Sequence, residues 1–189
     1  MITPDQLAAA VTACPVRRAE YWAPWLNQTW AVFGIDTPAR QAAWLAQIGH
    51  ESGSFRYVRE LWGPTPQQRR YEPPSTLATR LGNTRRGDGL RYLGRGLIQT
   101  TGRDNYARLR DELPDWTDEP VPDFEAEPQL VEQPLWAALS AGLYWQRREL
   151  NALADEGDFD AITQRINGGQ NGRDDRRARW ALARSVLCA

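Results

Sequence analysis

Two glutamates, Glu51 and Glu60, have the residue type and the setting for acid and base chemistry on a glycosidic bond. Glu51 ends an apolar run at helical spacing, with Ile48 and Trp44 on the same predicted face. A carboxyl at the end of a buried helix face is partly removed from water, which disfavours its charged form, so it can keep a proton near neutral pH. A protonated carboxyl near an ionised one can cleave a glycoside. The alternative is a structural ion pair between Glu51 and one of the 23 basic residues, all of them arginine.

Other catalytic groups are poorly supported. His50 is the only histidine, and without a Gly-x-Ser-x-Gly turn it does not indicate a Ser-His-Asp triad. We interpret His50 as a residue that fixes the helix end, and orientation of Glu51 is a second interpretation. Cys14 and Cys188 lack metal-ligand spacing, and a disulfide and two free buried thiols both stay open. We therefore expect no metal site and no cofactor.

A glycine-rich segment, residues 94–102, begins Gly94-Arg95-Gly96. It lacks the Gly-Lys-Ser/Thr of a phosphate loop, so we interpret its glycines as allowing the backbone to approach a ligand closely. Thr101 near its end either caps the helix that follows or holds a water with its hydroxyl.

The composition is that of an ordinary globular protein. The 189 residues are 41% hydrophobic and 25% charged, which predicts one domain or one domain with two lobes. A formal net charge of −1 gives no indication of a nucleic-acid partner. No stretch approaches the ~20 apolar residues that span a bilayer, and residues 1–5 lack the basic start of a secretion signal. We expect synthesis in the cytoplasm without a signal peptide, and no stable membrane association.

The periodicity predicts a mainly α (α+β) protein. Thr3-Pro4 and Thr37-Pro38 predict helix starts, and the second of these helices leads to Glu51. Glycine and proline punctuate residues 54–95, which we predict to be a small inserted lobe of short strands or loops, including a strand over Leu90–Leu93. A cleft between the helical lobe and this lobe would place Glu51 at its floor and Glu60 on the opposite wall. Residues 1–189 would form a single catalytic domain without a separate wall-binding module.

Several segments together resemble glycoside hydrolase family 19, the chitinase-like group that includes single-domain phage endolysins. They occur in the family's order: His50–Gly53 with Phe55; Tyr92–Gln99 through Asn105-Tyr106; Asp123–Glu125 with Pro128; Ala138–Ala141 with Tyr144-Trp145; Gly157–Thr163; and Ile166–Gly169. The resemblance spans roughly residues 40 to 180. It implies a lysozyme-like two-lobed fold, rich in α-helix, and hydrolysis with inversion.

The resemblance also implies roles for single residues. Glu51 matches the general acid, and Glu60 matches the general base, although the interval between them is shorter than in plant chitinases. Glu72 is the reserve candidate for the base. Thr101 falls where plant members carry a serine that holds the attacking water. Further positions match substrate-binding or network residues, among them an arginine that pairs with the catalytic carboxylates: His50, Tyr92, Gln99, Asn105, Asn167 and Arg176.

The expected function is that of an endolysin, acting as a monomer on the β-1,4 bonds of peptidoglycan glycan strands after release to the periplasm, through a holin. A chitinase is the alternative, because chitin and peptidoglycan share β-1,4-linked N-acetylglucosamine. A lytic transglycosylase, which needs an acid but no water-activating base, and a non-catalytic glycan-binding protein are further alternatives.

Overall fold

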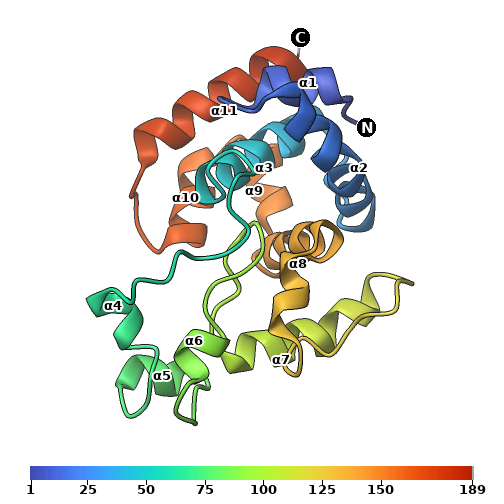
Figure 1. Ribbon diagram of the computed structural model, residues 1–189. Coiled ribbons are helices and arrows are strands. Elements are labelled where there is room, and N and C mark those ends of the chain that lie inside the picture. The colour runs from blue at the N-terminus through green and yellow to red at the C-terminus, as the bar shows by residue number, and fades with distance from the viewer. Residues whose placement is uncertain (189) are drawn as a thin grey trace. The chain divides into compact units, whose positions relative to one another are not determined.

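The computed structural model describes residues 1–188, which form helices joined by turns and loops (Figure 1). The predicted mainly helical class is confirmed. The chain divides into two compact units. The first comprises residues 1–57 and the described residues from 141 onward, and the second comprises residues 58–140. The second unit therefore runs further along the chain than the lobe expected at about residues 54–95.

The first unit is built from helices that lie far apart in the sequence. Its described helices are α1 (Pro4–Ala10), α2 (Val16–Val32), α3 (Pro38–Glu51), α9 (Leu150–Glu156), α10 (Phe159–Asn167) and α11 (Arg173–Leu187). A further helix, α8 (Pro134–Arg147), begins in the second unit and ends in the first. The N-terminal helix α1 and the C-terminal helix α11 lie side by side (Figure 1).

The predicted helix starts are confirmed, and local hydrogen bonds explain them. The Thr3 hydroxyl accepts from the Gln6 backbone N–H while the Gln6 side chain accepts from the Thr3 N–H, a reciprocal cap at the start of α1. The Thr37 hydroxyl caps α3 by accepting from the Arg40 N–H at 3.2 Å. These contacts need only neighbouring residues, which is why the sequence reveals them.

Helix α3 forms the centre of the first unit. Every residue from Ala42 to Gly49 is buried, so this helix is enclosed on all sides rather than on one face. Trp44 packs edge-to-face on Trp30 of α2, with 5.9 Å between ring centroids, and α11 packs extensively along α3. The end of α3, where Glu51 lies, is therefore rigidly positioned.

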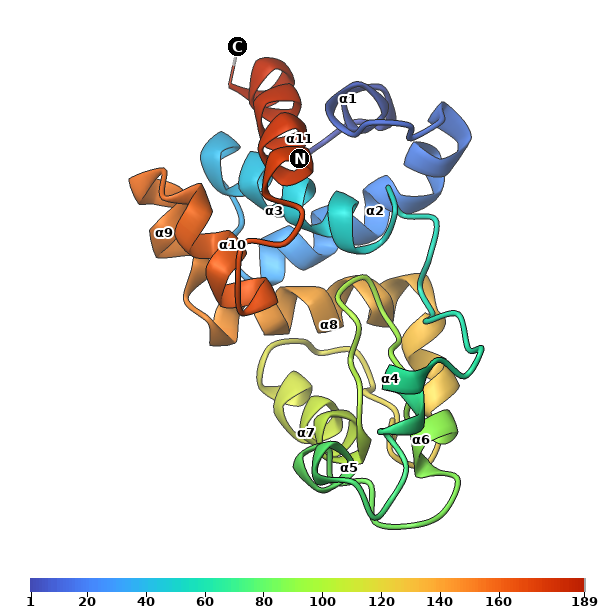
Figure 2. The same ribbon diagram turned by 90° about the vertical axis from the view of Figure 1, so that its left-hand side faces the viewer.

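The second unit combines short helices with long turns and loops, so the loops expected there are present and the expected strands are not (Figure 2). It contains α4 (Pro66–Arg69), α5 (Thr76–Arg80), α6 (Asp88–Arg91), α7 (Arg103–Glu112), and the 3₁₀ helices η1 (Leu113–Asp115) and η2 (Pro128–Glu132). Its β-structure consists of isolated bridges that Arg95 forms with Arg59 and with Thr100.

The strand predicted over Leu90–Leu93 is wrong, because α6 includes Leu90 and Arg91 and Tyr92 caps that helix. The Asp88 carboxylate accepts the backbone N–H groups of Thr84 and Arg85, each at 2.9 Å, which closes the preceding turn. Gly87 then starts the helix with φ +94°, a conformation that favours glycine. This turn chemistry outweighs the strand-like residue types that follow it.

A buried polar cluster ties the middle of the second unit together. Arg95 is 6% exposed, and its guanidinium donates to the Tyr106 hydroxyl at 3.0 Å and to Glu132 at 2.7 Å. The Tyr106 hydroxyl donates to the Leu93 carbonyl at 2.6 Å. Burial raises the pKa of Tyr106 above its ordinary value, so it stays a neutral donor. This cluster anchors the glycine-rich segment.

Both cysteines are free thiols, with Cys14 buried and Cys188 exposed. None of the helices within residues 1–188 combines the length and the apolar character needed to cross a membrane.

Candidate active site

Glu51 is the last residue of α3 and forms an ion pair with Arg176 of α11. Glu51 Oε1 and Arg176 Nη2 are 2.5 Å apart. The Arg176 side chain is 3% exposed, whereas 26% of the Glu51 side chain remains open to solvent. The pairing that the resemblance implies for Arg176 is therefore present, and it is also the ion pair to an arginine that stood as the alternative interpretation of Glu51.

A chain of buried hydrogen bonds holds Arg176 in place. Its Nη1 donates to Gln47 Oε1 at 2.5 Å, and Gln47 Nε2 donates to the Thr163 hydroxyl of α10 at 2.8 Å. Gln47 and Thr163 are fully buried, and the Thr163 hydroxyl donates onward to the Phe159 carbonyl at 3.1 Å. Both ends of the Gln47 amide are thus used, so the guanidinium faces Glu51 in one fixed orientation.

The role of Gln47 was not predicted from the sequence. Gln47 lies four residues before Glu51 on the same helix face, surrounded by apolar neighbours. A polar amide inside such a run needs a buried partner, and this was the signal that could have found it.

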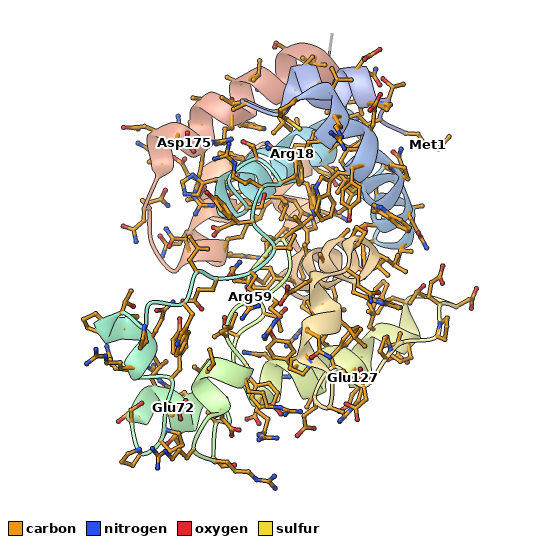
Figure 3. All side chains as sticks on the ribbon, viewed as in Figure 1. Met1, Arg18, Arg59, Glu72, Glu127 and Asp175 are labelled. Carbon is orange, nitrogen blue, oxygen red and sulfur yellow. The ribbon has the colours of Figure 1, made fainter. Side chains whose placement is uncertain are left out.

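His50 joins the end of α3 to α11 by a second contact. His50 Nδ1 lies 2.6 Å from Asp175 Oδ2, and the same oxygen accepts from Arg179 Nε at 2.6 Å (Asp175 is labelled in Figure 3). Burial by itself would raise the pKa of Asp175, but hydrogen bonds from Arg179 and His50 lower it below the ordinary value. This geometry agrees with the interpretation that His50 fixes the helix end.

Asn167, at the end of α10, supports the turn that leads into α11. Its Nδ2 donates to the Asn171 carbonyl at 3.2 Å, and Arg176 Nε donates to the same carbonyl at 3.1 Å. Gly172 in this turn has φ +70°, and any Cβ there would overlap the His50 ring. Asn167 and Gly172 thus help to place Arg176.

Glu60 belongs to the second unit, where three donors hold its carboxylate. Gln68 Nε2 and the Tyr71 hydroxyl donate to Oε1 at 2.9 and 3.4 Å, and the Gly94 N–H donates to Oε2 at 3.1 Å. The Glu60 N–H also donates to the Gly94 carbonyl at 2.8 Å. Burial and the nearby Glu60 charge raise the pKa of Tyr71, which keeps that phenol a donor. The half-buried Glu60 is therefore a preorganised acceptor, as a general base should be.

Glu72 has a structural task in the second unit. Its Oε2 accepts from the Gly87 N–H at 2.8 Å, just before α6 (Glu72 is labelled in Figure 3). A Cβ on Gly89 would lie 2.7 Å from Glu72 Oε1, so the carboxylate fills the space beside that glycine. Glu60 stays the predicted base and Glu72 the reserve candidate.

The remaining predicted residues of the second unit have varied surroundings. Thr101 does not cap α7, whose N-cap is Gly102; instead its half-buried hydroxyl donates to the Gln99 carbonyl at 3.3 Å. Asn105 is exposed and donates to the Thr101 carbonyl at 2.7 Å. Tyr92 is 1% exposed and its hydroxyl donates to the Glu125 carbonyl at 3.0 Å, so the expected substrate contact is corrected to a core position.

The space beside Gly94 and Gly96 is filled by other side chains of the protein rather than by a ligand. A Cβ on Gly94 would overlap Gln99, and a Cβ on Gly96 would lie 2.7 Å from the Ser140 hydroxyl. Gly96 also has φ +87°, which strains any other residue. The prediction that these glycines let the backbone approach a ligand is wrong, because both positions are tightly packed inside the protein. This packing brings Gln99 beside Gly94, whose N–H donates to Glu60.

Comparisons with known proteins identify the family. A Haemophilus influenzae protein described as a glycosyl hydrolase family 19 domain-containing protein is 37% identical to the chain over 167 residues, covering 76% of this chain and 78% of that protein. The chain belongs to glycosyl hydrolase family 19. No family model matches the sequence. The family membership makes this protein a glycosidase.

Two Arabidopsis thaliana endochitinases are 33% and 34% identical to this family 19 chain, over 68% and 70% of its length. The chain spans 39% and 40% of those proteins. Among solved structures, chitinase C from Streptomyces griseus HUT6037 has a TM-score of 0.70 at 21% identity, covering 100% of this chain and 77% of its own. A bacterial family 19 chitinase has a TM-score of 0.69 at 20% identity, covering 98% and 94%. These structures show that the fold is shared.

The residues described above can supply an acid, a base and fixed polar contacts without a metal. Within residues 1–188, no three side chains of histidine, cysteine, aspartate or glutamate gather as a metal-binding group.

The buried hydrogen bonds that link Arg176 to Gln47 and Thr163 should affect kcat more than substrate affinity. Thr163→Val removes the acceptor of the Gln47 amide, which leaves a buried donor unsatisfied at a cost of about 1–3 kcal/mol. If Arg176 then loses its fixed orientation, kcat should fall roughly tenfold while KM changes little. Steady-state kinetics and thermal melting measure the two effects.

Thr163→Ser is the matched control, because it keeps the hydroxyl. It should restore most of kcat. A Thr163→Val protein that melts at a lower temperature but keeps its full kcat would show that these hydrogen bonds contribute to stability alone.

Proposed function

We propose that the protein is an endolysin that hydrolyses the β-1,4 bonds of peptidoglycan glycan strands by an inverting mechanism. The proposal rests on the position of the Glu51 carboxyl. It is partly open to solvent, and an ion pair with the buried Arg176 holds it in place. A reactive carboxyl needs access to its substrate and a fixed direction, and this arrangement supplies both. The family membership supports glycan hydrolysis, and the resemblance to single-domain endolysins supports the wall polymer as substrate.

In the proposed reaction, Glu51 is the general acid. It donates its proton to the glycosidic oxygen as the bond from that oxygen to the anomeric carbon breaks. Glu60 is the general base and takes a proton from a water, whose oxygen bonds to the anomeric carbon from the opposite face. The Thr101 hydroxyl orients that water. The reaction breaks the glycosidic bond and consumes one water. At its end Glu51 has lost a proton and Glu60 has gained one.

Amide side chains are proposed to bind the sugar. Gln99, Asn105 and Asn167 carry both donors and acceptors, which suits the acetamido and hydroxyl groups of N-acetylated sugars. His50 acts through Asp175 and Arg179 on the position of the helix end. We propose that the protein acts as a monomer on the wall after synthesis in a host cytoplasm and release through a holin.

A chitinase remains the second proposed function. The relatives named endochitinases and the structures named chitinases favour it, and chitin shares the β-1,4-linked N-acetylglucosamine of peptidoglycan. The two proposals differ only in the polymer.

A parallel assay separates the two functions. Purified peptidoglycan sacculi and colloidal chitin are incubated with equal amounts of protein, and new reducing ends are counted. We expect rapid release from sacculi, slow release from chitin, and lysis of bacteria whose outer membrane has been permeabilised. Faster release from chitin with intact sacculi would reject the endolysin in favour of the chitinase.

A further inference from the structure

The second unit contains a hollow to which the proposed acid and base chemistry assigns no role. Its volume is about 730 Å³, and it lies between α6 and residues 123–126. A neighbouring hollow of about 510 Å³ shares Arg86, Gly87 and Leu90 with it. Volumes of this size suit small molecules or short peptide segments. Neither hollow includes Glu60 or Thr101 in its lining.

The acidic groups of the larger hollow are already neutralised within the second unit. Asp88 pairs with Arg103 at 2.6 Å, and Glu125 pairs with Arg103 at 3.1 Å and with Arg110 at 3.0 Å. Asp123 also contacts Arg110, at 3.4 Å. Burial by itself would raise the pKa of Asp88, but hydrogen bonds from Arg103 and from backbone N–H groups lower it. All three carboxylates are therefore occupied by arginines of the second unit.

Three arginines at the same hollow have no such counter-charge. Among the described residues, no carboxylate lies within 4.0 Å of the guanidinium of Arg85, Arg86 or Arg91. Arg91 contacts only neutral groups, the Tyr92 hydroxyl at 3.1 Å and the Ala126 carbonyl at 2.7 Å. The lining of the larger hollow thus holds four arginines against three carboxylates, an excess of one positive charge in a chain whose formal net charge is −1.

The wall beneath Arg91 and Arg103 is fixed before any ligand binds. The Tyr92 ring lies under the guanidiniums of Arg103 and Arg91, at 4.6 and 5.6 Å from the ring centroid. The Tyr92 hydroxyl donates to the Glu125 carbonyl, which ties α6 to residues 123–126. Leu90 is 47% exposed and adds an apolar surface to both hollows. The lining therefore fits a ligand that carries carboxylates beside small apolar groups.

We propose that this hollow binds the peptide stems of peptidoglycan through their free carboxylates. The inference rests on the proposed endolysin function and names the part of the wall polymer that the second unit recognises. Stem peptides combine alanine methyl groups with free carboxylates, whereas chitin has methyl groups but no carboxylates. A hollow with an exposed leucine suits a short acidic peptide better than a long phosphate polymer, which is typically bound along an extended basic stripe.

Direct binding tests the hollow without any catalysis. The probe is the free stem tetrapeptide L-Ala-D-Glu-meso-diaminopimelate-D-Ala, titrated into the full-length protein by calorimetry. We expect the Arg85→Ala/Arg86→Ala double variant to bind about tenfold more weakly, since each exposed charge pair contributes up to ~1 kcal/mol. Binding should weaken with added salt, and the tetrapeptide with its carboxylates amidated should not bind.

The matched control removes the same charge from the same unit. Arg69 and Arg80 are exposed and do not line the hollow, so Arg69→Ala/Arg80→Ala should bind the tetrapeptide like the unchanged protein. Equal affinity of the Arg85→Ala/Arg86→Ala protein, or no saturable binding to the unchanged protein, would overturn the proposal. Equally tight binding of inorganic polyphosphate at the same residues would replace it with a phosphate site.

A second readout separates this proposal from the proposed function. Release of reducing ends is measured on sacculi and on chitin oligosaccharides. The Arg85→Ala/Arg86→Ala change should slow hydrolysis of sacculi several-fold and leave hydrolysis of the oligosaccharides unaltered. If the unchanged protein digests sacculi and the double variant equals it, the peptide site fails while the endolysin stands. If the unchanged protein leaves sacculi intact, the endolysin function fails.

Discussion

Replacing Glu51 by glutamine is expected to lower hydrolysis of the glycan about a thousandfold while the protein stays folded. The amide cannot donate the proton that the leaving oxygen needs, and general acid catalysis contributes ~10²–10⁴-fold. The side-chain oxygen of glutamine can still accept from Arg176 Nη2, so the contact between α3 and α11 persists. Release of reducing ends from sacculi measures the rate, and thermal melting measures the fold.

The choice of variant makes the Glu51 result specific. Glu72→Gln changes a carboxylate of the same type whose contacts lie beside α6, so its activity should stay near that of the unchanged protein. Unaltered lysis of permeabilised cells by a folded Glu51→Gln protein would end the assignment of Glu51 as the acid.

The second large effect is expected at Glu60. Glu60→Gln removes the proton acceptor, and we expect kcat to fall about a hundredfold or more. The amide also turns an NH₂ group toward Gly94 N–H or Gln68 Nε2, which places a donor against a donor. This mismatch should cost a further ~1–3 kcal/mol of stability. Kinetics and thermal melting of the same sample separate the two losses.

Azide distinguishes a lost base from a merely disturbed loop. It is a nucleophile that needs no proton removed, so in Glu60→Ala it should restore part of the rate and yield a glycosyl azide of inverted configuration. No rescue, together with a full loss of activity in Glu72→Gln, would transfer the base assignment to Glu72.

The first unit follows closely from local sequence patterns. Thr3 and Thr37 start helices through caps that involve only their neighbours, and the apolar spacing of Trp44 and Ile48 correctly carries α3 to Glu51. Such features depend on residues within a few positions of one another, so the pattern predicts them well.

The supports of the candidate site depend on distant residues and were less predictable. Arg176 was identified through the family resemblance, but the path through Gln47 and Thr163 joins three helices and leaves only a buried amide as its signal. In the second unit, the turn closed by Asp88 produces α6 where residue types favoured a strand. Glu60 was singled out, yet the donors Gln68 and Tyr71 that hold it were not.

Mass spectrometry of the muropeptides released in H₂¹⁸O tests most directly whether the protein is a hydrolase that activates water. We expect fragments with ordinary reducing ends, each carrying one ¹⁸O at the newly freed sugar. The identity of that sugar shows which bond is cut, and the Glu51→Gln protein should release almost none of these fragments. Fragments ending in 1,6-anhydro sugars without ¹⁸O would contradict the role proposed for Glu60 and identify a lytic transglycosylase.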